Sequence, residues 1–210
     1  MHQAAGNIRL VPSSRSIADK RRMLPGAIDI LYSEVSGRFS LEFNLDEGEC
    51  QKFVAWSPPF QLRENISVDR VEREKRYIRL RSTTTVLPGI RFAVMDPRQY
   101  LCLGFIRSKM KGVVFLWGDT VALEDKAQET IAAFRAPPLF QQLKALIPGV
   151  PMSFPLIAGA MTVGVLEIRK WFATCRGVFR FDGSLPPALD PRILLGGVML
   201  LAKRLKEGGA

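Results

Sequence analysis

The chain has 210 residues, with 30 lysines and arginines against 20 aspartates and glutamates, and its formal net charge is +10. Hydrophobic residues make up 47% and charged residues 24%, which is enough apolar material for a folded core and excludes a disordered tail or a fibrous protein. One histidine and three cysteines without CxxC spacing exclude most imidazole-dependent catalysis, a disulfide framework and a cysteine-rich zinc site.

The positive net charge lies in the first 22 residues and in the second half of the chain. Residues 1–22 carry five basic side chains and one acidic one, residues 23–100 carry eleven of each, and residues 101–210 carry fourteen basic and eight acidic ones. Residues 1–26 contain serines and small residues but no apolar run, so a secretory signal is excluded. We predict that they form a flexible basic arm outside the folded domain, with an organelle transit peptide as the alternative.

From residue 28 onward the chain has the pattern of short strands separated by turns. Residues 39–45 alternate apolar and polar side chains, which is typical of a strand with one buried face. Residues 90–95 and 100–106 read as a hairpin, because Pro97 in the connection presets a turn dihedral. Further proline and glycine pairs punctuate the chain at intervals too short for a βαβ series. The sequence therefore predicts a mainly antiparallel β protein.

The second half of the chain contains one ambiguous segment. Residues 121–135 are rich in helix formers, so propensity alone predicts a helix, although the segment also fits a hairpin with its turn at residues 125–128. Residues 139–147 have apolar side chains at helical spacing and predict a short surface helix. Two more strands are expected at residues 162–168 and 178–181.

The most distinctive segment lies at the carboxyl end, where residues 193–202 read ILLGGVMLLA. A helix that is apolar all round must be buried, and ten residues span only about 15 Å, half of a bilayer core, so a conventional transmembrane span is not expected. Close approach of neighbouring strands would explain the two glycines. We expect a buried central helix over residues 190–205, with a good N-cap at its start. Its structural residues are Asp190, Pro191, Ile193, Leu194, Gly196, Gly197 and Leu200.

A β-rich chain that ends in a short, wholly apolar helix resembles the tubby-like superfamily, which includes the phospholipid scramblases and the LURP-one-related proteins. The resemblance covers roughly residues 28–205 and is carried by LGFIRSK (103–109), WGDTVALEDKAQETIAAFR (117–135), LFQQLKALIPG (139–149), VGVLEIRKWF (163–172), FRFDG (179–183) and LDPRILLGGVMLL (189–201). It implies an antiparallel β-barrel of about twelve strands closed around the C-terminal helix, within a single domain at residues 27–206 that a tail at 207–210 follows. It also favours the hairpin at residues 121–135.

For function, the resemblance implies a lipid or membrane connection. Tubby proteins bind phosphoinositides through basic residues, and scramblases are associated with calcium-dependent lipid movement. The acidic cluster at residues 46–49 lacks the D-x-D-x-D-G spacing of a calcium loop, and the palmitoylated cysteine run of animal scramblases is missing. Calcium-triggered scrambling is therefore disfavoured for this chain.

The leading expectation is a non-enzymatic protein that binds anionic membrane lipid. The sequence contains no GxSxG elbow, P-loop or HExxH motif, and no cofactor or metal site is expected. Scramblase-like lipid translocation and a scaffold for a protein partner remain alternatives. Nucleic-acid binding through the basic arm is disfavoured, because no recognition helix or RNP motif accompanies it. We expect a cytoplasmic protein at a membrane surface, with lipid-binding residues Arg107, Lys109, Lys111, Arg169 and Lys170.

Overall fold

The computed structural model describes residues 8–12, 34–35, 38–44, 50–56, 65–70, 75–86, 89–109, 119–137, 147, 149–170, 175–181 and 186–207. In these residues a series of strands precedes the helix α2 (Pro191–Glu207). The strands are β1 (Ile8–Pro12), β2 (Glu34–Val35), β3 (Arg38–Asn44), β4 (Cys50–Trp56), β5 (Asn65–Arg70), β6 (Lys75–Val86), β7 (Gly89–Asp96), β8 (Leu101–Lys109), β9 (Asp119–Glu124), β10 (Thr130–Arg135), β11 (Pro151–Ala158), β12 (Met161–Lys170) and β13 (Cys175–Phe181).

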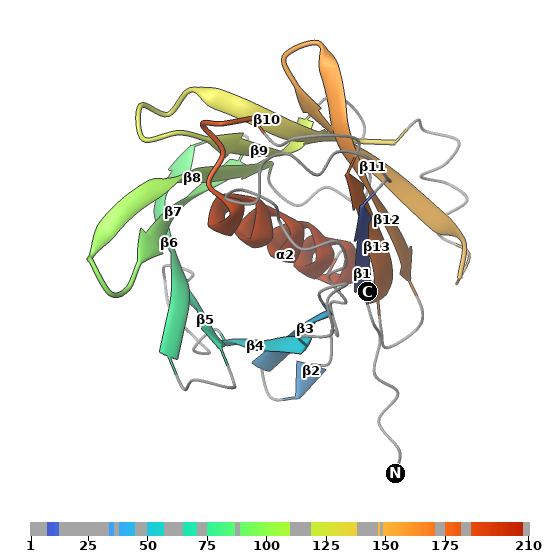
Figure 1. Ribbon diagram of the computed structural model, residues 1–210, viewed down its shortest axis with the longest axis horizontal. Coiled ribbons are helices and arrows are strands. Elements are labelled where there is room, and N and C mark those ends of the chain that lie inside the picture. Colours follow the sequence, from blue (N-terminus) through green and yellow to red (C-terminus); the bar gives the residue numbers. More distant parts are fainter. Residues whose placement is uncertain are drawn as a thin grey trace.

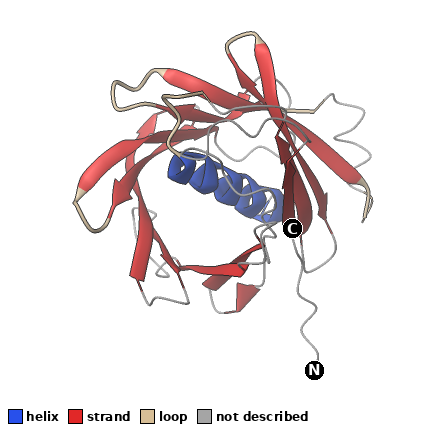
Figure 2. Ribbon diagram, in the orientation of Figure 1, coloured by secondary structure: helices blue, strands red, loops and turns tan. Residues whose placement is uncertain are grey.

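These strands form one curved sheet that bends around α2 (Figure 1). From β2 to β13, strands that follow one another in the chain are hydrogen-bonded neighbours, and every one of these pairings is antiparallel. Figure 2 shows the single described helix enclosed by strands. The described residues therefore establish a mainly antiparallel β fold with one C-terminal helix, as the sequence predicts.

The strand order has two ends, β1 and β2, and no hydrogen-bonded pairing joins these two strands within the described residues. The sheet as described is thus open, with thirteen strands where about twelve and a closed barrel were expected. The predicted helix at residues 139–147 lies almost wholly outside the described residues, which include only Ile147 of it.

Strand β1 differs from the expectation for the N-terminal arm. Its five residues pair in parallel with β13, from Ile8 opposite Gly177 to Pro12 opposite Phe181. The apolar side chains of Ile8, Leu10 and Val11 suit a strand. These five residues are therefore part of the sheet rather than of a flexible arm, whereas the rest of residues 1–26 lies outside the described residues.

Residues 121–135 form a hairpin, so the prediction from helix propensity is wrong and the one from the resemblance is confirmed. Asp125 closes the turn: its carboxylate accepts a hydrogen bond from the backbone N–H of Glu129, and its own N–H donates to the carbonyl of Glu129, both at 2.9 Å. The side chains of Leu123 and Phe134 face α2 and are fully buried. Packing against the helix thus outweighs the local preference of this segment.

Helix α2 confirms the prediction of a buried central helix, although it continues to Glu207, past the predicted end at residue 205 and into the predicted tail. Its residues 193–201 are all buried, in agreement with the absence of a polar face. The carboxylate of Asp190 accepts a hydrogen bond from the backbone N–H of Arg192 at 2.8 Å, which is N-cap geometry, and Pro191 occupies the first helical position.

The two glycines of α2 lie where strand side chains approach the helix closely. A Cβ atom on Gly196 would lie 2.8 Å from Cδ1 of Ile106, and one on Gly197 would lie 2.5 Å from Cδ2 of Leu123. Real Cβ atoms do not come this close to other carbon atoms, so only glycine fits without movement. The predicted reason for the glycine pair is therefore confirmed.

Candidate anion-binding surface

Two of the five predicted lipid-binding residues have described side chains. Arg107 lies on β8 and Arg169 on β12, and both are exposed. Lys109 and Lys170 are the last residues of the same two strands, and Lys111 lies outside the described residues.

The sheet register places Arg107 and Arg169 far apart. Three strands separate β8 from β12, and the residue on β12 that aligns with Arg107 through them is Thr162, seven positions before Arg169. At typical strand spacing and rise, this is about 19 Å across the sheet and about 23 Å along it. The convergence that the sequence suggested is not found for this pair.

Arg107 instead belongs to an ion-paired cluster on the outer face of β7, β8 and β9. Its Nε donates a hydrogen bond to Oε1 of Glu124 at 2.7 Å, and Nε of Arg91 lies 3.0 Å from Oε2 of the same carboxylate. Glu124 is only 1% exposed, whereas the Arg107 side chain is 46% exposed. Arg91 also donates from Nη1 to the side-chain oxygen of Gln128.

The cluster offsets the repulsion between two arginines that the sheet register places opposite each other. Arg91 and Arg107 are directly opposite each other on adjacent antiparallel strands, a position where like charges repel. Glu124, placed on β9 beside Arg107, contacts both guanidinium groups and offsets this repulsion. The cluster keeps a net positive charge, and the Nη groups of Arg107 have no hydrogen-bond partner in the described part of the chain.

Two more exposed arginines continue this surface on β6. Arg79 and Arg81 alternate with Ile78 and Leu80, which are fully buried, so the two arginines point to the outer face. Cross-strand partners connect them to the cluster, because Arg81 is opposite Ala93, which is opposite Phe105, which is opposite Glu124. We call the set Arg79, Arg81, Arg91 and Arg107 the arginine face.

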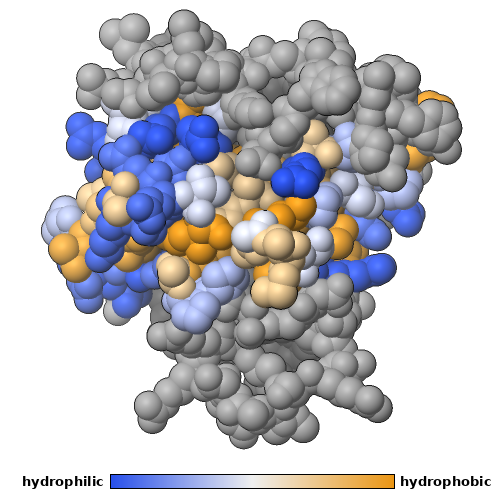
Figure 3. All heavy atoms as spheres, turned by 90° about the horizontal axis from the view of Figure 1, so that it is seen from above, coloured by the Kyte–Doolittle hydropathy of each residue, from blue (hydrophilic) through white to orange (hydrophobic). Residues whose placement is uncertain are grey.

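Among the side chains that the structure describes on β6 to β9, few acidic groups compensate the arginine face. Apart from Asp119, whose side chain is outside the described part, the acidic residues of these strands are Asp96 and Glu124, and each is ion-paired with arginine. Arg79 and Arg81 form no ion pair with the described residues. Figure 3 shows hydrophilic residues gathered on the left of the described surface, the side on which β6, β7 and β8 lie in Figure 1. The arrangement can therefore attract anions.

Arg79, Arg81 and Arg91 were not predicted as binding residues from the sequence. They lie within residues 23–100, where equal numbers of basic and acidic side chains give no net charge. The signal was present in KRYIRLR at residues 75–81, where arginine alternates with isoleucine and leucine at the period of a strand. Arg91 lacked any such local signal, because its role depends on the register with Arg107.

A second charged network joins the start of α2 to the turn between β7 and β8. Arg192 donates from Nη1 to Asp96 Oδ2 at 2.6 Å and from Nη2 to Asp190 Oδ2 at 2.9 Å. Hydrogen bonds with Asp190 and Asp96 raise the pKa of Arg192. The backbone N–H of Arg98 and the guanidinium of Arg192 lower the pKa of Asp96 below its ordinary value. This network fixes the helix against the sheet.

Comparison of the chain with protein-family models, with curated proteins and with solved structures finds no match. Among the described helices none is long and apolar enough to cross a bilayer. The described part of the chain also holds no group of three or more His, Cys, Asp or Glu residues arranged to bind a metal ion. Cys102 is a free, half-buried thiol on β8, whose sulfur lies 3.4 Å from the carbonyl oxygen of Gly104.

Proposed function

We propose that this protein is a non-enzymatic binding domain that meets anionic membrane lipid through the arginine face. The observation that carries the proposal is the register of β6, β7 and β8, which gathers four arginines from three adjacent strands on one outer surface. Arginine presents its N–H groups in a fork that matches phosphate oxygens, and it keeps its charge at every physiological pH.

For the architecture, we propose a tubby-like, LURP-one-like barrel in which the two ends of the sheet meet. Support comes from β1 and β3, whose Cα atoms approach within 8 Å of one another although the strands lie near opposite ends of the strand order. The buried apolar residues 193–201 of α2 are also what a closed sheet would enclose. In such a barrel the arginine face is part of a convex outer wall, accessible to a membrane surface.

The expected strength of binding follows from the net charge of the surface. Each basic residue near an anionic membrane contributes about 1 kcal/mol, and Glu124 offsets one of the four arginines. The arginine face should therefore contribute about 3 kcal/mol, which corresponds to roughly a hundredfold preference for anionic over neutral vesicles. Because the charges are exposed, this preference should fall steeply as salt rises.

Co-sedimentation with vesicles tests the proposal. The full chain should bind phosphatidylcholine vesicles that contain phosphatidylserine or a phosphoinositide, and it should bind pure phosphatidylcholine far less. R79Q/R81Q should lose at least about tenfold in affinity for the anionic vesicles. The matched control is R169Q/R180Q, which removes the same charge from exposed positions of β12 and β13 and should bind nearly as the native chain does.

Two results of the vesicle measurements would overturn the proposal. The first is equal binding to neutral and anionic vesicles by the native chain. The second is equal loss in R79Q/R81Q and R169Q/R180Q, since net charge rather than the arginine face would then explain the binding. A nucleic acid that displaces the vesicles at equal salt, and that binds tighter than they do, would assign the same surface to the alternative of nucleic-acid recognition.

A further inference from the structure

The turn between β7 and β8 exposes two adjacent large apolar side chains. Tyr100 is 84% exposed and Leu101 is 51% exposed, and the exposed side chain of Arg98 lies two residues before them. Single exposed apolar side chains are common on protein surfaces, whereas adjacent ones form a contiguous apolar patch, and such patches mark interaction sites. We call residues 98–101 the hairpin tip.

The hairpin tip is held in place rather than loose. The Asp96 carboxylate accepts hydrogen bonds from the backbone N–H groups of Arg98 at 2.8 Å and Gln99 at 3.3 Å. The same carboxylate is ion-paired with Arg192 of α2. The tip is therefore anchored to the central helix, and its apolar side chains are presented outward at little further cost in conformational entropy.

The backbone at Tyr100 adds a second observation. Its φ angle is 56°, in the left-handed region that glycine and asparagine adopt more readily than an aromatic residue. A tyrosine here costs conformational energy, and its ring makes no buried contact that offsets the cost. Backbone conformations of this kind cluster at functional sites, although Gln128 in the β9–β10 turn adopts one too, with a φ angle of 67°.

Resting on the proposed function, we propose that the hairpin tip inserts into the interfacial layer of the anionic membrane. Tyrosine is enriched in that layer, because its ring is apolar and its hydroxyl is polar. Two basic residues lie at or near the tip. Arg98 belongs to it, and Arg79 is opposite Met95, the residue before Asp96. Their charges would meet lipid phosphates while Tyr100 and Leu101 enter the layer beneath.

A protein partner fits the tip less well than a bilayer does. Specific protein interfaces bury about 800 Å² on each partner around a central cluster of anchors, and two side chains on a narrow turn cannot supply such an area. A bilayer needs no shape complementarity, and insertion of a few apolar side chains adds to the electrostatic attraction. The tip therefore assigns the membrane attachment an orientation, with the β7–β8 turn and the adjoining outer face of β6 to β8 toward the lipid.

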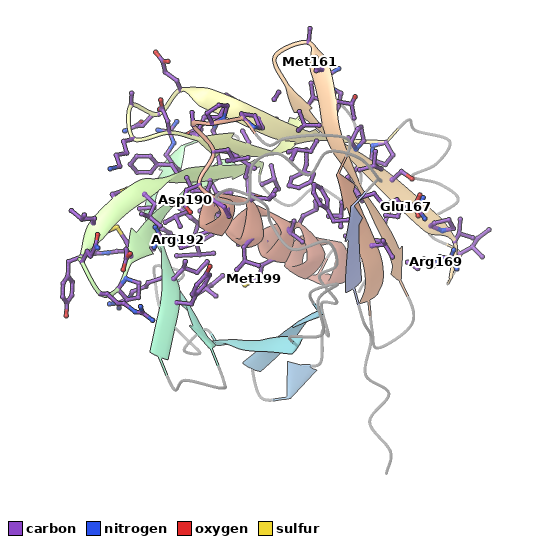
Figure 4. The ribbon with its side chains drawn as sticks, viewed as in Figure 1. Met161, Glu167, Arg169, Asp190, Arg192 and Met199 are labelled. Carbon is purple, nitrogen blue, oxygen red and sulfur yellow. The ribbon has the colours of Figure 1, made fainter. Side chains whose placement is uncertain are left out.

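The test separates insertion from charge attraction. In Y100N/L101S, asparagine accepts the left-handed backbone and both apolar groups are lost; Y100N alone is a second, milder variant. The control is M161S, which removes an apolar side chain, 70% exposed, at the first residue of β12, labelled at the top of Figure 4. Vesicle affinity at about 0.1 M and about 0.5 M salt, and the rise in surface pressure of an anionic lipid monolayer, are measured for each.

The native chain and M161S should raise the monolayer pressure and keep measurable vesicle binding at the higher salt. Y100N/L101S should raise the pressure little and should lose about tenfold or more in affinity at both salts, with Y100N intermediate. If the tip variants bind vesicles as tightly as the native chain at both salts and raise the monolayer pressure equally, insertion is overturned, whereas the proposed function still holds. Failure of the native chain to bind anionic vesicles at either salt would overturn the proposed function, and insertion with it.

Discussion

Glu124 is the side chain that allows Arg91 and Arg107 to stand directly opposite each other. Its carboxylate is buried, and each oxygen faces the Nε of one arginine. A buried carboxylate without partners would be costly, and so would two unscreened guanidinium groups on facing positions. The same residue therefore stabilises the sheet and limits the positive charge of the arginine face. Its removal should lower the stability of the fold but strengthen binding to anionic lipid.

We predict that Glu124→Gln lowers stability and strengthens vesicle binding. Loss of the carboxylate charge removes two ion pairs, and about 1 to 3 kcal/mol of unfolding free energy should be lost. For a chain of this size the Tm should fall by roughly 2–10 °C. Affinity for anionic vesicles should rise about fivefold, because the net charge of the arginine face increases by one.

The control for this prediction is Glu167→Gln on β12. Glu167 is partly exposed and lies 3.7 Å from Arg180, itself 60% exposed, so its removal should change Tm by little. Differential scanning calorimetry and vesicle co-sedimentation provide the two readings. A Glu124→Gln protein with unchanged Tm would show that the cluster contributes nothing to folding, and weaker vesicle binding would contradict its place on the lipid surface.

At the scale of elements, the sequence predicted best what is determined locally. Helix α2 was predicted because its apolar run and its N-cap at Asp190 are continuous in the chain. The hairpin β9–β10 was not predicted by propensity, because its strand form depends on packing against Gly197, which lies more than sixty residues away. Only part of the arginine face could be predicted from the sequence. The alternation of arginine with apolar residues indicates the outer face of β6, but the position of Arg91 opposite Arg107 depends on the register of β7 and β8.

The Asp96–Arg192 contact between the β7–β8 turn and α2 predicts a pH dependence. Hydrogen bonds from Arg98 and Arg192 lower the pKa of Asp96 in the folded chain, so folding favours its charged form. Its contribution to stability is then complete above the unfolded pKa, about 4, and is lost progressively as the pH falls below that value. The native chain should become less stable between about pH 5 and pH 2, in part through this group.

Asp96→Asn tests this dependence, because asparagine keeps an oxygen acceptor for the turn but cannot titrate. The variant should be less stable than the native chain at pH 7, and the difference in unfolding free energy should shrink as the pH is lowered toward 2. Urea unfolding at several pH values gives the comparison. A difference that stays constant over this range would mean that Asp96 has the same pKa in the folded and unfolded chain.

At the scale of the whole molecule, strand β1 is the feature that the sequence indicated least. It pairs with β13, more than 160 residues later in the chain, and five residues with mixed composition give no local sign of such a partner. The pairing covers the free edge of β13 and brings β1 next to β3. Residues 8–12 thus belong to the part of the fold where the two ends of the sheet approach.

Deletion of residues 1–12 should therefore destabilise the protein. Removal of a five-residue strand should cost about 2 to 5 kcal/mol, or roughly 5–15 °C in Tm, and it should promote aggregation through the uncovered edge of β13. Deletion of residues 1–7 keeps β1 and serves as the control, with little expected change. Equal Tm values for the two deletions would show that β1 contributes nothing to the folded domain.

The most direct test of the central claim is an arginine footprint on the membrane-bound protein. Phenylglyoxal modifies accessible guanidinium groups, and mass spectrometry gives the extent of reaction at each arginine with and without anionic vesicles. We predict protection of Arg79, Arg81 and Arg107 by the vesicles, while Arg169 and Arg180 on β12 and β13 stay reactive. Protection of Arg169 and Arg180 with no protection of the arginine face would contradict the account.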